Sequence, residues 1–323
     1  MNATDADDRM ADPAVGVRQA SRRRSGVHKR RRSRAAVRAS RPVAWYARMR
    51  ALLALPPIAA AALAGAMLLT ECEADGRSPE RAQAAAGSAA GRVEQLGVKV
   101  LDVLPHDPKA YTQGLEMAGR TLYEGTGRAG ESSIRLGPPG RPPTVRADLR
   151  APLFGEGITV LGPTLWQLTW RDHIAIERDA GTLAELRRLP YTQEGWGVCH
   201  QPGRGRLVTS DGSARLTFRE PQTLAPLGEL VVTLHGRPVP RLNELECVGD
   251  SVYANVWPSN GIVRVDADTG AVTAQIDASG LLTPTERQHA EVLNGIAAVP
   301  GTDEFLITGK WWPKMFRVVF VAR

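Results

Sequence analysis

One carboxylate stands out in the sequence because its neighbours are apolar. Glu156 lies in the segment LFGEGITVLG, where a glycine flanks it on each side and the remaining residues carry no charge. A carboxylate in an apolar strand costs free energy unless it is paired, hydrogen-bonded or protonated. Glu156 is therefore a candidate functional residue. The alternative is a structural carboxylate that accepts hydrogen bonds from backbone amides of neighbouring segments.

Glu156 begins one of five similar segments along the chain. These segments are YTQGLEM from 111, FGEGITV from 154, EGWGVCH from 194, LNELECV from 242 and VLNGIAA from 292. The polar or bulky residues near their starts are Gln113, Glu156, Trp196, Asn243 with Glu244, and Asn294. A second apolar run follows each segment, and three of these runs end at Trp170, Trp257 and Lys310.

The repeats predict the elements that hold these residues. Each repeat contains three short β-rich runs separated by Gly, Asp and Pro turns, and its length of about 40–50 residues fits one four-stranded propeller blade. Five blades need roughly 230 residues, which residues 95–323 supply. We predict an all-β fold, a five-bladed β-propeller. An irregular β-sandwich would not explain five repeats with one order of strands.

A propeller would bring the repeated positions together. The innermost strands of the blades surround the central axis, so equivalent residues meet at one mouth of the channel. Tryptophans, amides, a carboxylate and a lysine would then share one pocket, which is the usual composition of a ligand site. Taken singly, each has a structural alternative, because tryptophans also pack between blades and asparagines also cap turns.

The cysteines and histidines form no recognisable metal site. The three cysteines make no CxxC pair, and the six histidines make no HxxxH or HExxH pattern, so we predict no metal, although scattered ligands could still converge in space. Cys199 and Cys247 fall at equivalent positions of neighbouring repeats. A disulfide between them requires Cα atoms within about 7 Å. We expect two buried thiols instead.

The basic charge is concentrated at the N-terminus. The net charge is +7, and residues 1–50 hold 14 of the 41 Lys and Arg but only 4 of the 34 Asp and Glu. Residues 51–70 carry no charge over 20 residues, which is long enough to span a bilayer. We predict a disordered cytoplasmic tail over 1–50, a transmembrane signal anchor (or a signal peptide) over 51–70, and a linker over 71–94. The propeller is then extracytoplasmic, either anchored to the membrane or secreted if the anchor is cleaved.

Motifs in one consistent order identify a family resemblance. HDPKAYTQGLE, YEGTGRAGESSIR, FGEGIT, LTW, EGWGV, LVTSDGS, RLNELE, YANVWPSNGIVRVD and VLNGIA with ITGKWWPKMF lie between about Val98 and Val318. They resemble the glutaminyl-peptide cyclotransferase family of the plant and bacterial type. That resemblance implies a five-bladed propeller without a cofactor, unrelated to the zinc-dependent animal enzymes. It also implies an enzyme that cyclises N-terminal glutamine to pyroglutamate and releases ammonia.

The resemblance implies roles for nine residues. The family's acid/base glutamate matches Glu156. Its substrate-pocket residues match Tyr111, Gln113, Phe154, Trp170, Trp196, Asn243, Trp257 and Lys310. The family usually has Phe where this chain has Tyr111, and the added hydroxyl needs a hydrogen-bond partner. Gln113, Asn243 and Lys310 are all candidates to stabilise the oxyanion of a tetrahedral intermediate.

The resemblance implies one kind of partner, peptides or proteins with N-terminal glutamine. The uncharged run over residues 51–70 separately predicts the membrane as a second partner. No aromatic or fold motif supports nucleic-acid binding by the tail, and we expect the catalytic domain to be monomeric. The same fold could instead serve as a non-catalytic peptide- or envelope-binding propeller, or as a metal-dependent lactonase-like propeller, because propellers host many functions.

Overall fold

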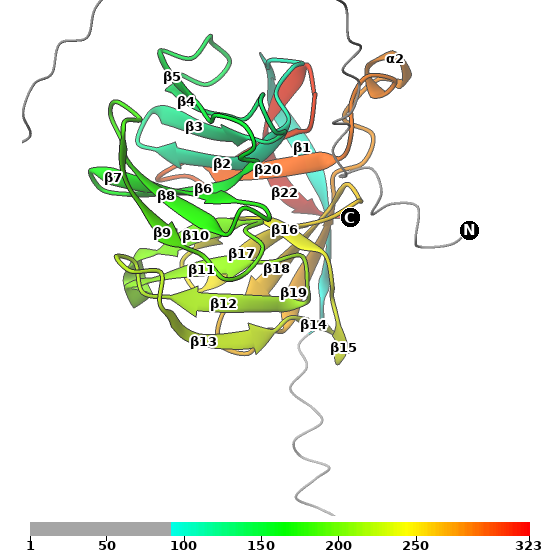
Figure 1. Cartoon of the computed structure of the whole chain (residues 1–323). Helices are drawn as coiled ribbons and strands as arrows, with labels where there is room; N and C mark the ends of the chain where they lie inside the picture. Colours follow the sequence, from blue (N-terminus) through cyan, green and yellow to red (C-terminus); the bar gives the residue numbers. More distant parts are fainter. Residues whose placement is uncertain (1–91) are drawn as a thin grey trace, which may run out of the picture. The chain divides into compact units, whose positions relative to one another are not determined.

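The computed structural model describes residues 92–323, which form an all-β body with very little helix (Figure 1). Three four-stranded antiparallel sheets and one eight-stranded sheet make up nearly all of it. The remaining elements are the hairpin of β14 (Thr233–Leu234) and β15 (Arg237–Pro238), the 3-10 turn η2 (Pro202–Arg204) and the four-residue helix α2 (Pro284–Arg287). The prediction of an all-β fold is confirmed.

The three four-stranded sheets each follow chain order. The first contains β2 (Thr112–Ala118), β3 (Thr121–Thr126), β4 (Ser133–Gly137) and β5 (Val145–Asp148). The second contains β6 (Gly155–Leu161), β7 (Thr164–Thr169), β8 (Ile174–Asp179) and β9 (Glu185–Pro190). The third contains β10 (Val198–Gln201), β11 (Arg206–Ser210), β12 (Arg215–Arg219) and β13 (Pro226–Val231).

The eight-stranded sheet joins the two ends of the described chain. Its order is β16-β17-β18-β19-β1-β22-β21-β20. Its strands are β1 (Glu94–Pro105), β16 (Leu242–Val248), β17 (Ser251–Val256), β18 (Gly261–Asp266), β19 (Val272–Asp277), β20 (Leu293–Ala298), β21 (Phe305–Gly309) and β22 (Lys314–Ala322). The start of β1 pairs in parallel with β19, and β1 pairs antiparallel with β22 from Leu96 to Pro105. The first strand is therefore held between two C-terminal strands.

The strands predicted from the repeats are all present. The five segments that start alike form the strands β2, β6, β10, β16 and β20. These inner strands contact one another in a closed cycle, in that order, with β20 returning to β2. The second and third runs of each repeat form the next two strands outward. The cycle of inner strands is what brings distant repeats to one place.

Burial decreases from the inner strands to the outer ones. β6 is buried over its first five residues, and β7, with the sequence TLWQLT, is buried along almost its whole length. In contrast, β9 has the sequence ELRRLP and is exposed at most positions. A strand packed on both faces is apolar, whereas charged side chains on an edge strand prevent pairing with other chains. The chemistry-bearing inner strands therefore rest on apolar layers.

One turn recurs between the third and fourth strands of two sheets. After β8, the Asp179 carboxylate accepts hydrogen bonds from Gly181 N and from both N and Oγ1 of Thr182. After β18, Asp266 accepts in the same way from Asp268 N and from Thr269. Short polar side chains that bond the backbone a few residues on are a common way to fix such turns.

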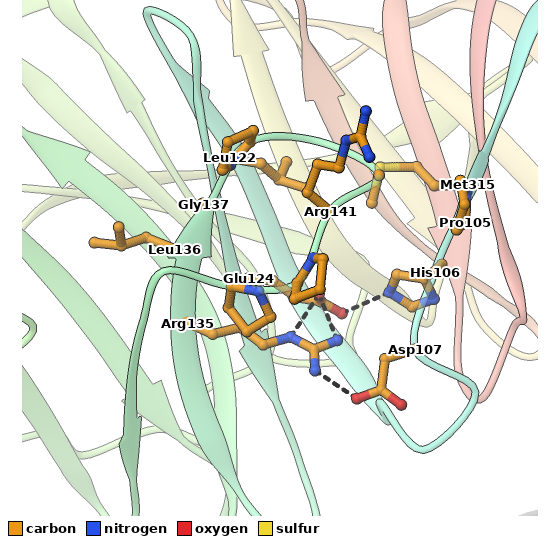
Figure 2. Close-up of a pocket in the computed structure, with 14 residues that line it drawn as sticks. Pro105, His106, Asp107, Leu122, Glu124, Arg135, Leu136, Gly137, Arg141 and Met315 are labelled. Atoms are coloured by element: carbon orange, nitrogen blue, oxygen red, sulfur yellow. Dashed lines mark hydrogen bonds and ion pairs between the residues drawn. The ribbon is translucent and has the colours of Figure 1, made fainter.

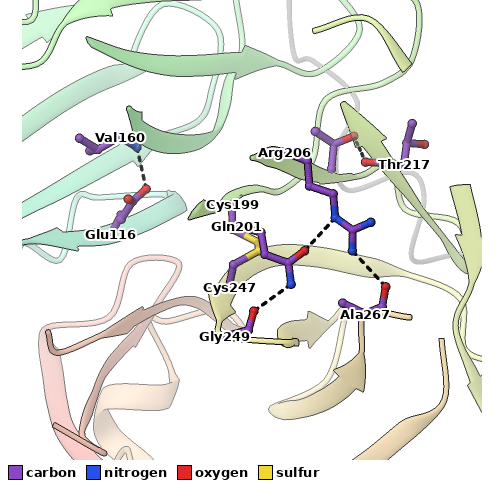
Figure 3. The surroundings of a disulfide bond; sticks show 10 residues. Glu116, Val160, Cys199, Gln201, Arg206, Thr217, Cys247, Gly249 and Ala267 are labelled. Atoms are coloured by element: carbon purple, nitrogen blue, oxygen red, sulfur yellow. Dashed lines mark hydrogen bonds between the residues drawn. A yellow bond between two sulfur atoms is a disulfide. The ribbon is translucent and has the colours of Figure 1, made fainter. Parts of the chain in front are cut away.

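The prediction of two buried thiols is wrong, because Cys199 and Cys247 form a disulfide (Figure 3). Cys199 lies on β10 and Cys247 on the neighbouring inner strand β16, and their Cα atoms are 5.4 Å apart. Equivalent positions of consecutive repeats thus meet across the junction of two sheets, within disulfide reach. Beside the bond, Gln201 Nε2 donates to Gly249 O over 2.8 Å.

The N-terminal predictions lie outside the described residues. The tail over 1–50, the apolar segment over 51–70 and most of the linker over 71–94 fall there, so they stay predictions. Within residues 92–323, no helix has the length and apolar character needed to cross a bilayer.

Candidate active site

Four inner strands carry a β-bulge where the predicted polar residues lie. In β2, for example, Thr112 pairs with Thr126 and Gly114 with Gly125, so Gln113 has no partner opposite it. The residues left out of register in the four strands are Gln113, Glu156 with Gly157, Asn243 with Glu244, and Asn294 with Gly295. Bulges occur next to active sites because they re-aim side chains. Here they free the repeated polar residues from regular sheet pairing.

Three of these residues form one hydrogen-bonded chain. Asn294 Nδ2 donates to Gln113 Oε1 over 3.1 Å, and Gln113 Nε2 donates to Glu156 Oε1 over 2.9 Å. Exposure is 2% for Glu156 and 0% for both amides. Because Asn294 occupies the carbonyl oxygen of Gln113, the NH₂ group of Gln113 faces Glu156. β20, β2 and β6 together therefore fix the orientation of the carboxyl.

The environment of Glu156 favours its protonated form. Burial raises the pKa of this carboxyl well above its ordinary value. The positive charge of Lys310 works in the opposite direction, and the negative charge of Glu194 raises the pKa further. A raised pKa makes this carboxyl a stronger base than an ordinary glutamate, as a group that takes a proton and later returns it requires.

Lys310 is a buried amine with no hydrogen-bond partner among residues 92–323. It follows β21 directly, and its Nζ lies 4.8 Å from the centre of the Tyr111 ring. Burial lowers the pKa of Lys310 to about 8, while the charges of Glu156 and Glu291 raise it. An unpaired buried ammonium is costly, so a ligand that supplies an acceptor to Nζ would be bound favourably.

Aromatic side chains form two groups around these polar residues. In the first, Tyr111 lies 6.3 Å from Phe154 and 5.0 Å from Trp311, and Phe154 lies 5.5 Å from Trp170, all between ring centres. In the second, the rings of Trp196 and Trp257 lie 6.1 Å apart. All the aromatic residues predicted for the site therefore contact another member.

The last predicted pocket residue, Asn243, also has an unsatisfied atom. Its Oδ1 is buried and has no partner among the described residues. Its neighbour Glu244 has a structural role instead, because its carboxylate accepts from Leu115 N over 3.2 Å and from Ile296 N over 2.8 Å. The Glu244 carboxylate thus fastens β16 to β2 and β20, which is the structural role stated above as the alternative for Glu156.

The glycines beside Glu156 make room for neighbouring strands. A Cβ on Gly157 would lie 2.6 Å from Trp196 O, and one on Gly155 would lie 2.8 Å from Thr126 O. Gly157 N also donates to Trp196 O over 2.8 Å. Any larger residue would push the inner strands apart, so these glycines set the spacing of the site.

Sequence reasoning missed three residues that support the site. Trp311 extends the aromatic group, and Glu291 accepts a hydrogen bond from the Tyr111 hydroxyl over 3.2 Å. That bond supplies the partner that the Tyr111 hydroxyl needs. Glu194 accepts from the indole nitrogens of Trp170 and Trp196. Trp311 and Glu194 lie inside the motifs WWPK and EGWGV, but the pattern gave no sign of what they contact.

An ionic cluster of Glu124, His106, Arg135 and Asp107 lines a cavity (Figure 2). Glu124 accepts from Thr112 Oγ1 over 2.7 Å, from His106 Nε2 over 3.0 Å and from Arg135 Nε over 2.9 Å. Arg135 also donates to Asp107 over 2.7 Å. The cavity of about 380 Å³ that these residues line does not include Glu156. Because Thr112 precedes Gln113, the cluster steadies the start of the site strand.

The described residues hold no candidate metal centre. Within 92–323, no group of three or more His, Cys, Asp or Glu side chains could hold a metal ion.

A search against known proteins decides the family. The family model for glutamine cyclotransferase matches residues 71–320. The chain belongs to the glutamine cyclotransferase family. A curated relative from Arabidopsis thaliana, named glutaminyl-peptide cyclotransferase, is 35% identical over 237 residues, covering 68% of this chain and 70% of that protein.

A solved member of the family has the same architecture. The crystal structure of Myxococcus xanthus glutaminyl cyclase is 35% identical, with a TM-score of 0.65, and the match covers 72% of this chain and all of that one. The all-β body is therefore similar to that of the Myxococcus xanthus enzyme. The resemblance predicted from the motifs is confirmed.

Proposed function

We propose that this protein is a glutaminyl-peptide cyclotransferase, an enzyme that converts N-terminal glutamine of peptides to pyroglutamate with release of ammonia. One observation carries the proposal beyond membership of the family. Glu156, a fully buried carboxyl with a raised pKa, is held by Gln113 among aromatic residues and near the charge of a buried lysine. This arrangement fits an intramolecular acyl transfer that needs one group to move a proton.

Glu156 is the proposed acid and base. The substrate's α-amine nitrogen attacks the γ-carboxamide carbon, a new C–N bond closes the five-membered ring, and Glu156 takes the proton from the amine. The same carboxyl then gives that proton to the departing nitrogen, the old C–N bond breaks, and ammonia leaves. The reaction is intramolecular, so much of the catalysis comes from holding the substrate in a folded conformation.

Lys310 is the proposed donor to the oxyanion. Gln113 has its NH₂ group committed to Glu156, whereas Lys310 Nζ has no hydrogen-bond partner among residues 92–323. A preorganised cation in a water-poor site stabilises developing negative charge strongly. Asn243 is proposed as a substrate contact, because its Oδ1 is free to accept a hydrogen bond from the carboxamide or the amine.

The aromatic residues are proposed to enclose the glutamine side chain. Tyr111, Phe154, Trp170, Trp196 and Trp257 come from several sheets and form the two groups described above. Enclosure excludes water, strengthens the electrostatic interactions inside the site, and limits hydrolysis of the intermediate. A terminal glutamine fits such a site because its stem is apolar and its end is an amide.

We also propose that the fold is a five-bladed propeller. The closed cycle of inner strands supports this proposal, together with an eight-stranded sheet that resolves into two groups of four strands on either side of the β1–β19 pairing. Two separate blades that meet where the ring of blades closes should pair over a short stretch only. The two groups of four strands do so through β1 and β19.

We propose that the domain works outside the cytoplasm, with residues 51–70 as its anchor or export signal. The Cys199–Cys247 disulfide supports this proposal, because disulfides persist in oxidising compartments. Protease accessibility of the domain tests it, in cells whose outer envelope layers have been removed and whose cytoplasmic membrane is intact. Protection of the domain until the cytoplasmic membrane is broken would contradict the proposal.

The activity is tested by incubating the purified protein with a Gln-initiated dipeptide and measuring ammonia. We expect stoichiometric release of ammonia and formation of the pyroglutamyl peptide. A folded protein that binds the dipeptide without releasing ammonia would instead be a peptide-binding propeller. Loss of activity with a chelator would favour a metal-dependent enzyme.

A further inference from the structure

Glu194 lies at the centre of a hydrogen-bonded cluster that the proposed chemistry does not use. One carboxylate oxygen, Oε2, accepts from Trp170 Nε1 over 3.0 Å and from Trp196 Nε1 over 3.1 Å. The other, Oε1, accepts from Arg171 Nε over 2.8 Å. A carboxylate that binds two indoles and a guanidinium at once is a strong local restraint, because hydrogen bonds to charged groups are stronger than neutral ones.

This carboxylate spans the break between the two aromatic groups. Trp170 belongs to the group of Tyr111 and Phe154, whereas Trp196 packs on Trp257. Trp170 follows β7, and Trp196 precedes β10 of the next sheet. Glu194 lies on the connection between these sheets. It therefore joins aromatic residues that come from different sheets.

The backbone around Glu194 is held as firmly as its side chain. Gly195 N donates to Thr169 O over 3.1 Å and to Trp170 O over 3.2 Å. A Cβ on Gly195 would lie 2.6 Å from Thr169 O, so this close approach requires glycine. The connection between β9 and β10 is thereby fixed to the end of β7. This attachment places Glu194 where its carboxylate reaches both indoles.

Arg171 balances the charge of Glu194. Its guanidinium lies 4.1 Å from the centre of the Trp170 ring, while its Nε binds the carboxylate. The Glu194 side chain is 32% exposed. The two opposite charges partly cancel at any nearby group, so removal of either partner changes the electrostatic potential there. Because the pair is partly exposed, water screens that change.

We propose, on the basis of the cyclotransferase activity proposed above, that Glu194 is a positioning residue that holds Trp170 and Trp196 as one wall, and that the Glu194–Arg171 pair contributes to the electrostatic field at Glu156. The geometry for the second part is that Gly195, next to Glu194, binds Thr169 O, and Thr169 pairs with Gly155, next to Glu156. Three groups bear on Glu156 from the elements around it, apart from the neutral amide of Gln113. Lys310 lowers the pKa of Glu156, Glu194 raises it, and the Tyr111 hydroxyl is neutral and bound to Glu291.

Two variants test the proposal because they change the same ion pair in opposite ways. Glu194→Gln removes the negative charge, so the two indoles, which share Oε2 of the carboxylate, would donate to a neutral amide oxygen, and Arg171 loses its acceptor. Arg171→Gln keeps both indole bonds and removes the balancing positive charge. The readout is kcat/KM for a Gln-initiated dipeptide as a function of pH, in the full-length protein. The substrate's own amine ionises identically in every assay, so differences between variants report the enzyme.

We expect the acid limb to move to lower pH in Glu194→Gln and to higher pH in Arg171→Gln, each on the order of a few tenths of a pH unit for a screened charge. We expect KM to rise by about tenfold in Glu194→Gln, because both indole bonds lose the negative charge that strengthens them, and to change less than about twofold in Arg171→Gln, which keeps that charge. Glu185→Gln, which alters an exposed pair on β9, should leave both quantities unchanged.

The proposal would be overturned if the acid limb of the kcat/KM profile moved in the same direction in both variants, or moved in neither. If Glu194→Gln fails to fold, the upward shift in Arg171→Gln still decides the electrostatic part, and Glu194→Asp, which keeps the charge but shortens the reach, decides the positioning part through KM. An inactive wild-type protein would reject the cyclotransferase activity itself, whereas an active wild type with unaltered variants would reject only the role of Glu194.

Discussion

Gln113 donates a hydrogen bond to Glu156 over 2.9 Å, and both side chains are buried although they are 43 residues apart in sequence. Their strands, β2 and β6, are equivalent inner strands of neighbouring sheets. The pair therefore shows how repetition along the chain becomes a reactive site.

Replacing Glu156 by Gln should lower kcat by at least about a hundredfold, because the variant can neither accept nor release the proton. Ammonia release from a Gln-initiated dipeptide measures the effect, and circular dichroism checks the fold. Glu229→Gln, on the exposed outer strand β13, is the matched control and should keep full activity. A near-normal rate in Glu156→Gln would show that Glu156 is structural.

Replacing Lys310 by Met should lower kcat by about a hundredfold, in the range found when one oxyanion donor is lost. The positive charge of Lys310 lowers the pKa of Glu156, so its removal should also move the acid limb of kcat/KM upward. In the wild type, activity should fall as Lys310 loses its proton near its pKa of about 8. That alkaline fall should be missing from the residual activity of Lys310→Met, and its persistence would assign it to another group.

Replacing Tyr111 by Phe should change kcat/KM by less than about threefold. The hydroxyl makes one long hydrogen bond, to Glu291 over 3.2 Å, and such a bond contributes little net free energy. The ring itself lies beside Lys310 and Phe154. Tyr111→Leu should therefore lose far more activity than Tyr111→Phe in the same dipeptide assay, and equal losses would show that the hydroxyl acts directly.

Replacing Glu124 by Gln should reduce the free energy of unfolding at pH 7 by about 3–5 kcal/mol, because it removes the buried partner of Arg135 and leaves only the partly exposed Asp107. Despite burial, the charges of His106 and Arg135 lower the pKa of Glu124 to about 2. Its contribution is therefore complete above its ordinary value and is lost as the pH falls toward 2. Urea unfolding should show a smaller difference in the free energy of unfolding between variant and wild type at pH 3 than at pH 7.

The control for Glu124 is an exposed ion pair in the same sheet. Arg146 Nε donates to Asp148 over 2.7 Å on β5, with both side chains largely exposed. Asp148→Asn should change the free energy of unfolding by less than about 1 kcal/mol. A cost for Glu124→Gln as small as this would mean that the buried cluster does not stabilise the fold.

Removing the disulfide with the double substitution Cys199→Ser and Cys247→Ser should cost about 2–4 kcal/mol of stability, because the bond closes a loop of 48 residues. Thermal unfolding with and without reductant measures it. The wild type should lose stability in reductant, while the double variant should be insensitive. If reductant does not change the stability of the wild type while the double variant is less stable, the loss comes from altered packing and not from the missing cross-link.

The sequence by itself determined the repeats, and with them most of the fold. Strand-like runs in one order, with turn residues between them, specify where each strand begins, because a period-2 apolar pattern and a turn are local properties. The same repeats placed Gln113, Glu156 and Asn294 at equivalent points. The motifs identified the family and the residues Trp170, Trp196 and Trp257.

Only the tertiary structure decided which of these residues touch. Cys199 and Cys247 are 48 residues apart, and whether they bond depends on the distance between two inner strands, which no local pattern encodes. The same holds for Glu194, whose neighbours in sequence did not show that its carboxylate binds two indoles from different sheets. The β-bulges that release Gln113 and Glu156 likewise arise from pairing between strands. Contacts across sheet junctions depend on packing of the whole ring, so the sequence could name the members of the site but not the bonds between them.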